Sequence, residues 1–268
     1  MLWFIIFADD TSIFCSHKDI GILFKVVNDE LDKVSAWFCA SKLVATLKKT
    51  NYMLFSLNPP PVLRWEIKLN NLSIDRVSSC KFWGVVMNDK LNWKQHIAYI
   101  NAKISRNIGI LKRSKAKLNA DSLLTLYNCL ILPYLNYGNL IWSSTYVSTL
   151  QKLITSQKRA VRIVNKSFYN AHTKPIFKYL KVLPLYDINV FQTLVFMYRH
   201  SCDLLPDVFN DCFQYSCNVY GLRGRTTAHY VQPFARTNIK TFSLLIQGPK
   251  HWNALPDYLR EAPTLSMF

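Results

Sequence analysis

A block of positive charge occupies the middle third of the chain. Between Lys90 and Lys181 the sequence contains 16 basic residues and one acidic residue, Asp121, whereas the segments on either side are close to neutral. Nearly all of the formal charge of +17 therefore lies in this segment, here called the basic block. Such a block repels itself unless a polyanion or counterions neutralise it. Lysine-rich, solvated helix faces are an alternative, but solubility alone would not concentrate the charge in one place, so the block predicts a phosphate-binding surface.

The apolar residues of the basic block recur at helical spacing, which predicts helices with one buried and one basic face. After Trp93, the stripe of the first helix consists of Ile97, Ile100, Ile104, Ile108 and Leu111. We expect a second helix to begin near Asp121 and to end at Pro133. A third helix is expected from Thr149 to Val164, and a fourth from Ile188 to Tyr198. After Cys202, glycine and proline, including Gly248-Pro249, predict a loop-rich region.

The first third of the chain combines strands with one helix. Leu2 to Phe7 is an apolar run that predicts a strand of a hairpin, and Asp19 is suited to cap a helix that reaches Ala40. Asn70-Asn71 is typical of a tight hairpin turn. Further strand-like segments are Tyr52 to Leu57, Trp65 to Leu69, and Cys80 to Met87. The expected fold class is therefore α+β.

Composition excludes some classes of protein and compartment. Seven glycines weaken any assignment to Rossmann or P-loop folds, which need glycine where the backbone meets phosphate. Seven scattered cysteines without a Cys-x-x-Cys pair indicate an intracellular, reducing compartment, with cytoplasm and nucleus both open. No membrane partner is expected, because polar residues and Pro133 interrupt the apolar stretch from Leu123 to Trp142.

Asp9 and Asp10 form an adjacent pair of acids at the expected tip of the first hairpin. Two carboxylates so close repel each other, and a hard divalent ion relieves that repulsion. Magnesium also keeps positions open for phosphate oxygens, as phosphoryl transfer requires. Asp-Asp pairs are also common in surface turns, so this pattern alone leaves both interpretations open.

Several motifs resemble the polymerases of non-LTR retrotransposons of the jockey and chicken-repeat kind. Phe7-Ala8-Asp9-Asp10-Thr11 resembles the Tyr/Phe-Ala-Asp-Asp turn of reverse transcriptases. Motifs that follow in the same order include Lys48-Lys49-Thr50-Asn51-Tyr52-Met53-Leu54-Phe55, Phe82-Trp83-Gly84-Val85, Pro133-Tyr134-Leu135-Asn136-Tyr137-Gly138, Gln157-Lys158-Arg159-Ala160-Val161-Arg162 and Gly248-Pro249-Lys250-His251-Trp252-Asn253-Ala254-Leu255-Pro256. The resemblance covers essentially all 268 residues. Each motif is short, but their order and spacing together are specific.

The resemblance implies a fragment of an RNA-directed DNA polymerase. Residues 1–90 would be a partial palm of β-hairpins plus one helix, residues 91–185 a basic helical thumb and connection, and residues 186–268 a helical and loop-rich C-terminal region. The implied partners are an RNA template with a DNA primer, or an RNA–DNA hybrid. The nucleic-acid-binding residues expected from the basic block are Lys94, Lys103, Arg106, Lys112, Arg113, Lys115, Lys158, Arg159 and Arg162.

The resemblance also implies roles in catalysis. Asp9 and Asp10 would be the catalytic carboxylates that bind Mg²⁺, and Lys49 (or Lys48) would neutralise charge or protonate the leaving pyrophosphate. Trp83 and Gly84 would belong to the primer grip. Simpler interpretations remain open, because adjacent lysines are often a solvated pair and a glycine in a strand often marks a bulge.

In the family, the fingers and another palm aspartate precede the Asp-Asp turn, whereas only eight residues precede Asp9 here. We therefore expect a missing N-terminal polymerase segment as a partner, no polymerase activity of the chain alone, and a hairpin with a bare edge and exposed apolar faces. Two further hypotheses are a non-catalytic module that binds RNA or an RNA–DNA hybrid, and an inert retroelement relic.

Overall fold

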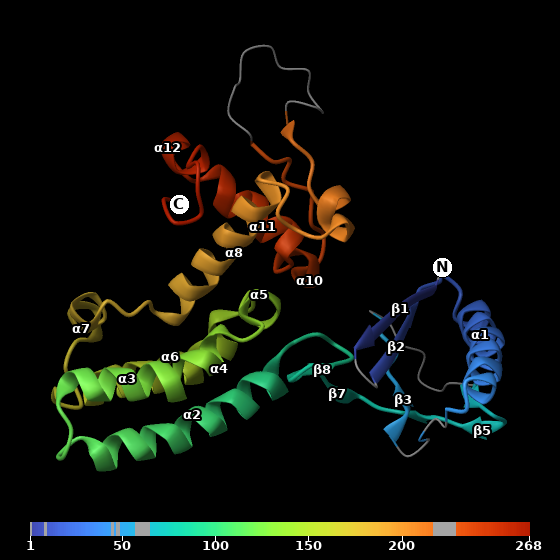
Figure 1. Ribbon diagram of the computed structural model, residues 1–268, viewed down its shortest axis with the longest axis horizontal. Helices are drawn as coiled ribbons and strands as arrows, with labels where there is room; N and C mark the ends of the chain where they lie inside the picture. Colours follow the sequence, from blue (N-terminus) through green and yellow to red (C-terminus); the bar gives the residue numbers. More distant parts are fainter. Residues whose placement is uncertain (1, 8–9, 44–45, 47–48, 57–64, 217–228) are drawn as a thin grey trace. The chain divides into compact units, whose positions relative to one another are not determined.

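The computed structural model describes residues 2–7, 10–43, 46, 49–56, 65–216 and 229–268. The chain divides into two compact units, Met1–Lys90 and Leu91–Phe268 (Figure 1). Unit 1 combines short β-hairpins with one long helix, and unit 2 is helical.

Unit 1 begins with the expected hairpin and helix. Strand β1 (Leu2–Phe7) pairs antiparallel with β2 (Asp10–Cys15), so that Phe7 is the register partner of Asp10. Helix α1 (Ile20–Ala40) begins after Asp19, whose carboxylate accepts a hydrogen bond of 2.9 Å from the backbone N–H of Ile22. This bond satisfies one of the free amides of the first turn, so the predicted N-cap is confirmed.

Short strand pairs complete the centre of unit 1. Strand β3 (Asn51–Tyr52) runs parallel to β6 (Asp75–Arg76), and β4 (Lys68–Leu69) pairs antiparallel with β5 (Leu72–Ser73). Asn70 and Asn71 connect β4 to β5 with φ angles of 53° and 63°, which confirms the predicted hairpin turn. The buried core here consists of Phe24, Ile67, Leu69 and Ile74.

The prediction of one strand from Cys80 to Met87 is wrong. The segment forms two strands, β7 (Ser79–Phe82) and β8 (Val85–Asn88), which pair antiparallel. Trp83 and Gly84 lie between them with φ angles of 43° and 81°. A two-residue turn with both φ angles positive suits the twist of a hairpin, and Gly84 adopts this conformation without steric cost.

Strand β1 is exposed along its length, as expected. The side chains of Trp3, Phe4, Ile5, Ile6 and Phe7 are between 38% and 68% exposed. Since successive side chains of a strand point to opposite faces, both faces of β1 are open to solvent. Among the described strands, β1 pairs with β2 alone, so its other edge carries free backbone groups.

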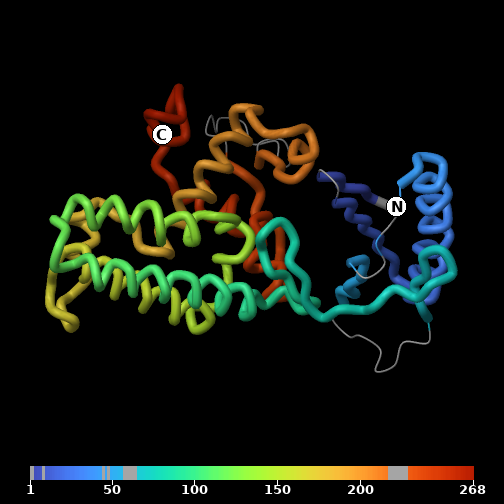
Figure 2. The backbone as a smooth tube through the Cα atoms, turned by 60° about the horizontal axis from the view of Figure 1, so that its bottom comes forward, coloured from blue at the N-terminus to red at the C-terminus, as the bar shows by residue number. Residues whose placement is uncertain are grey.

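Unit 2 begins with a bundle of helices around one large core. Helices α2 (Lys94–Ser114), α3 (Ala120–Leu130) and α6 (Val147–Val164) lie side by side in both views (Figures 1 and 2). The short helices α4 (Leu132–Asn136) and α5 (Asn139–Trp142) connect α3 to α6, and α7 (Thr173–Leu180) and α8 (Leu185–Ser201) follow. The predicted stripe of α2 is confirmed, because Ile97, Ile100, Ile104, Ile108 and Leu111 are all buried in this core.

The prediction that Pro133 ends the second helix is wrong. Pro133 lies in the first turn of the helix that follows. Helix α3 stops at Leu130, and α4 begins at Leu132 with Pro133 in its first turn. Proline is tolerated there because the first amides of a helix have no intrahelical acceptor.

The end of the chain holds a second, smaller core. The elements after α8 are the 3-10 helix η2 (Asp207–Cys212), α10 (Asn238–Thr241), α11 (Leu244–Asn253) and α12 (Asp257–Arg260). The prediction that Gly248-Pro249 belongs to an irregular segment is wrong, since both residues lie inside α11 and are buried. Gly248 permits close packing of α11 on α8, because a Cβ atom there would lie 2.6 Å from Sδ of Met197.

Among the described residues, no single helix has both the length and the apolar character needed to cross a bilayer. Helices α7 and α8 satisfy the length and composition criteria only when taken together, as a pair bent by 44°.

Candidate nucleic-acid interface

Helices α2 and α6 together carry the basic residues predicted to bind nucleic acid. Ser156 Oγ donates a hydrogen bond of 2.7 Å to Asn101 Oδ1, and Lys115 Nζ donates one of 3.4 Å to the carbonyl of Ser167. Asn101 lies next to Ser156, and Lys115, later in the chain, lies next to Ser167. The residue numbers of the two partners thus increase in the same direction, so α2 and α6 run parallel. The two helices lie side by side (Figure 2), and each of them carries basic residues.

Six of the nine predicted nucleic-acid-binding residues are exposed, and three are held by the fold. The exposed set is Lys94, Arg106, Lys112, Arg113, Lys158 and Arg159. Arg162 instead donates from Nε to the carbonyl of Ala171 over 2.7 Å, and Lys103 Nζ lies 5.7 Å from the ring centroid of Tyr99. Lys115 holds Ser167, as described above. These three residues are thus less available to a ligand than the other six.

No described carboxylate neutralises the basic block through an ion pair. The ion pairs that the structure shows, Glu30–Lys33, Glu66–Lys68 and Asp257–Arg260, all lie outside residues 90–181. The exposed cations of the block are therefore balanced only by solvent ions unless an anionic ligand binds.

Helix α7 adds basic residues that the predicted set omitted. Lys174 and Lys178 of α7 and Lys181, which follows it, are exposed, while Ile176 and Phe177 are buried. We did not predict this helix, although the spacing of Lys174 and Lys178 around two apolar residues was a readable signal of one solvated and one buried face.

The predicted metal-binding turn lies partly outside the described residues. Asp10 is exposed at the start of β2, whereas Asp9, like Lys48, is not among the described residues. Lys49 is exposed just before β3, and within the described part of the chain no hydrogen bond or ion pair joins its side chain to Asp10. No three described His, Cys, Asp or Glu side chains come close enough together to hold a metal ion.

The turn that holds the predicted primer-grip residues packs on the β1–β2 hairpin. The ring centroid of Trp83 is 5.4 Å from that of Phe7, and the Trp83 ring stacks on Phe82 at 4.7 Å. Phe82 in turn meets Phe14 of β2 edge to face at 6.1 Å. The turn that holds Trp83 and Gly84 therefore packs on the hairpin that holds Asp10. The predicted primer grip therefore contacts the two strands on either side of the acidic turn, whereas within the described residues no hydrogen bond or ion pair joins Lys49 to Asp10.

Comparison with known proteins found relatives of one kind. The chain is 27% identical over 146 residues to a retrovirus-related Pol polyprotein from the type-1 retrotransposable element R1 of Bradysia coprophila, an alignment that covers 52% of this chain and 14% of the relative. It is 23% identical over 185 residues to the RNA-directed DNA polymerase from the mobile element jockey of Drosophila melanogaster (68% of this chain, 20% of the relative). It is also 23% identical over 169 residues to a probable RNA-directed DNA polymerase from transposon BS of the same fly (61% and 18%).

The chain is related to the reverse transcriptases of non-LTR retrotransposons. It spans a fifth or less of the length of these relatives. No family model and no solved structure matches it significantly.

Two of the motifs that resemble these reverse transcriptases contain residues that stabilise unit 2. The first is the motif that begins at Gln157. Gln157 is buried, and its Nε2 donates hydrogen bonds to the hydroxyl of Tyr127 (3.0 Å) and the carbonyl of Leu183 (2.9 Å). Its Oε1 accepts from the backbone N–H of Leu185 over 2.9 Å. Gln157 thus connects α6 to α3 and to the beginning of α8.

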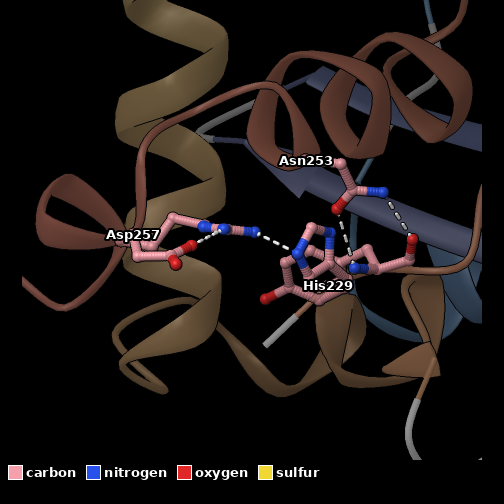
Figure 3. A network of polar contacts seen from close by, with 5 residues as sticks. His229, Asn253 and Asp257 are labelled. Atoms are coloured by element: carbon pink, nitrogen blue, oxygen red, sulfur yellow. Dashed lines mark hydrogen bonds and ion pairs between the residues drawn. The ribbon is translucent and has the colours of Figure 1, made fainter. Parts of the chain in front are cut away.

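The Trp252-Asn253 motif has a similar structural role near the end of the chain. Trp252 is fully buried, and Asn253 exchanges two hydrogen bonds, of 2.9 and 2.8 Å, with the backbone of Tyr230 (Figure 3). On the other side of the same network, Arg260 pairs with Asp257 and donates to Nε2 of His229 over 2.8 Å. Asn253 therefore connects α11, and Arg260 connects α12, to the segment around Tyr230.

Proposed function

We propose that this chain is a nucleic-acid-binding part of an RNA-directed DNA polymerase. In this proposal, exposed lysine and arginine side chains of α2 and α6 contact the phosphates of an RNA template or an RNA–DNA hybrid. The observation that carries the proposal is the basic block, which lacks ion pairs with described carboxylates, in a chain related to retrotransposon reverse transcriptases. Unit 1 would correspond to part of the palm and residues 91–185 to the thumb.

In the intact polymerase, Asp9 and Asp10 would be carboxylate ligands of the magnesium ions used in phosphoryl transfer. The described residues do not by themselves fit such a site, because no third acid, histidine or cysteine joins Asp10 in a cluster that could hold a metal. Catalysis would therefore need ligands in addition to those described. We assign no catalytic step to Asp10, Lys49 or Trp83 in this chain alone.

The test is binding to a fluorescein-labelled RNA–DNA hybrid, measured by anisotropy over a range of salt concentrations. Binding through phosphates releases counterions, so the logarithm of the affinity should fall linearly with the logarithm of salt concentration. The triple variant K112Q/R113Q/R159Q should weaken binding and reduce the steepness of that line by roughly 2 to 3. The matched control R236Q/K240Q/K250Q removes three exposed charges from the C-terminal part of unit 2 and should leave the slope nearly unchanged.

Two outcomes would contradict the proposal. One is equal retention of the chain by neutral and anionic polymers. The other is an equal loss of affinity in the two triple variants, which would indicate that only the net charge matters.

A second candidate is a binding module that has no catalytic role. It is favoured by the fact that all of the proposed phosphate contacts lie within unit 2, so that binding needs nothing from the acidic turn of unit 1. Joining upstream polymerase sequence to the chain separates the candidates. A part of a polymerase should then extend a primer and lose this activity in the double variant D9N/D10N. A non-catalytic module would bind RNA but would not produce primer extension. An inert relic would show no salt-dependent binding at all.

A further inference from the structure

A pair of bare aromatic rings lies at the end of the α2–α6 pair. The loop that connects α6 to α7, residues 165–172 and here called the tip loop, contains Phe168 and Tyr169, which are 84% and 90% exposed. They are the two most exposed large hydrophobic side chains in the described part of the chain. Tyr179 of α7 is 76% exposed. Large apolar rings are normally covered, so two adjacent ones in open solvent call for a physical explanation.

The tip loop holds these rings on a fixed backbone. At the end of α6, the N–H of Ser167 bonds to the carbonyl of Arg162 (2.9 Å) and the N–H of Lys166 bonds to that of Ile163 (3.0 Å). These two bonds form a Schellman motif, in which Lys166 has a left-handed φ of 54°. The Nε of Arg162 then holds the carbonyl of Ala171 on the far side of the loop (2.7 Å).

Two more contacts fix the middle of the tip loop. Asn165 Nδ2 donates to Ser167 Oγ over 2.7 Å, and Lys115, at the end of α2, donates to the carbonyl of Ser167 over 3.4 Å. The rings of Phe168 and Tyr169 have no ring contact with another described aromatic residue. The loop thus presents two free rings from an ordered support, which lowers the entropic cost of binding something on them.

Exposed lysines occur in the tip loop, at the end of α2 and in or just after α7. Lys166 precedes Phe168 by two residues, and the contact between Lys115 and Ser167 brings the end of α2 to the same place. The exposed lysines of these segments are Lys112, Lys117, Lys166, Lys174, Lys178 and Lys181. The only acidic residue of the basic block, Asp121, lies in the first turn of α3. A ligand of the tip loop should therefore be both anionic and able to cover flat apolar rings.

We propose that the tip loop binds unpaired bases of single-stranded RNA, with Phe168 and Tyr169 stacking on successive bases and the neighbouring lysines contacting the phosphates. Single strands are the nucleic acids that meet both requirements, because the faces of their bases are free, whereas a duplex buries them. The proposal rests on the nucleic-acid-binding function proposed above and adds to it a site for single strands at the end of the bundle.

An anionic membrane is the main competing ligand, since aromatic and basic residues also gather at membrane interfaces. The composition of the tip loop favours RNA. Residues 165–172 contain no leucine, isoleucine, valine or methionine that would insert into acyl chains. The loop instead offers two rings among asparagine, serine, lysine and histidine side chains.

The test uses the full chain and two fluorescein-labelled probes, a single-stranded RNA of about 16 nucleotides and an RNA duplex of the same length. The double variant F168A/Y169A should lose about 10-fold to 100-fold in affinity for the single strand. It should lose less than about 2-fold for the duplex, which is bound through its phosphates. F168Y/Y169F keeps both rings and should bind both probes as the unchanged chain does. F234A/Y258A removes two rings that are 80% and 73% exposed elsewhere and should have no effect.

The outcomes separate this inference from the function on which it rests. If the unchanged chain binds the duplex and F168A/Y169A binds the single strand normally, the stacking site is wrong and the phosphate-binding function stands. If the unchanged chain binds neither RNA, both are wrong. An equal loss for both probes would also overturn the stacking site, as would a loss of binding to phosphatidylserine vesicles with RNA binding unchanged.

Discussion

The indole ring of Trp83 lies 5.4 Å from the ring of Phe7, the residue that ends β1 just before the acidic turn. Through this contact, and through the stacking of Trp83 on Phe82, the β7–β8 hairpin supports the hairpin that carries Asp10. Two segments more than 70 residues apart in sequence are thereby joined at the hairpin that carries Asp10.

Replacing Trp83 should loosen both hairpins. Trp83→Ala removes two ring pairs, each worth about 0.5–1.5 kcal/mol, so we expect a loss of about 1–3 kcal/mol in local stability. Hydrogen–deuterium exchange should become faster in residues 2–15 and 79–88 and remain unchanged in unit 2. Trp83→Phe keeps a ring in place and serves as the control. Unchanged exchange in Trp83→Ala would show that the contact does not stabilise unit 1.

Gly248→Ala should destabilise the second core of unit 2. The added Cβ would lie 2.6 Å from Sδ of the buried Met197, so either the Met197 side chain or the two helices would have to shift, at a cost of about 1–3 kcal/mol. Urea denaturation measures the change. Gly109→Ala in α2 is a matched control, because the nearest atom to its Cβ would be 3.8 Å away on the Arg113 side chain. That substitution should be neutral or should stabilise the chain by about 0.5–1 kcal/mol. An equal effect of both substitutions would contradict the packing argument.

Gln157→Leu should destabilise the large core although leucine is close in size to glutamine. The substitution leaves the N–H of Leu185 and the carbonyl of Leu183 without their partner, and each buried unsatisfied group costs about 1–3 kcal/mol. Thermal unfolding followed by circular dichroism is the measurement. Gln151→Leu, at an exposed position of the same helix, should have little effect. A thermal midpoint unchanged by Gln157→Leu would argue against the bridging role.

Stability should fall in mild acid because of His96. Burial lowers the pKa of His96 from its usual 6.5 to about 4 in the folded chain. As pH falls from 6.5 to 4, the unfolded chain binds a proton on His96 that the folded chain does not yet accept. The free energy of unfolding therefore decreases across this interval, by up to about 3 kcal/mol from this residue.

The variant His96→Phe isolates this contribution while keeping a ring beside Trp142, which His96 meets edge to face at 5.5 Å. Burial and the nearby charge of Lys250 also lower the pKa of His251, so the unchanged chain and the variant will share that part of the pH dependence. Their difference in urea denaturation should grow between pH 6.5 and pH 4. Parallel pH curves would show that His96 is not the cause.

The purified chain should not extend a DNA primer on an RNA template in the presence of magnesium. The described residues provide no cluster of three metal ligands, and two ions need more carboxylates than one turn supplies. Incorporation of a labelled nucleotide is the measurement. Extension that disappears in Asp9→Asn would contradict this expectation and would show that the acidic turn works with ligands of this chain.

The features predicted correctly were those with local causes. The buried stripe from Ile97 to Leu111 follows from helical periodicity, and the cap at Asp19 and the turn at Asn70-Asn71 follow from the chemistry of those side chains. Pro133 and Gly248 were misjudged because their effect depends on position within a helix and on a distant neighbour. No local pattern in the sequence shows that Met197 lies against Gly248.

The charge of the candidate interface could be predicted from the sequence, but which of its side chains are exposed and free of other contacts could not. The basic block is visible as a count of residues, yet Arg162 and Lys115 are partly occupied by carbonyls of the tip loop, which only the fold brings to them. Phe168 and Tyr169 gave no signal in the sequence, because an aromatic pair is as typical of a core as of a bare loop. Their significance comes from the exposed surface that surrounds them.

Because α2 and α6 run parallel, both helices end at the tip loop, and their backbone dipoles point the same way. Each helix C-terminus carries a partial negative charge of about half an elementary charge. Lys112 and Arg113 in the last turn of α2 and Arg162 in that of α6 lie at these negative ends. Each such cation gains about 0.3–1 kcal/mol from the dipole. The peptide carbonyls at these helix ends therefore stabilise cations that no described carboxylate neutralises. This stabilisation allows the unbound chain to hold several cations close together at one end of the helix pair.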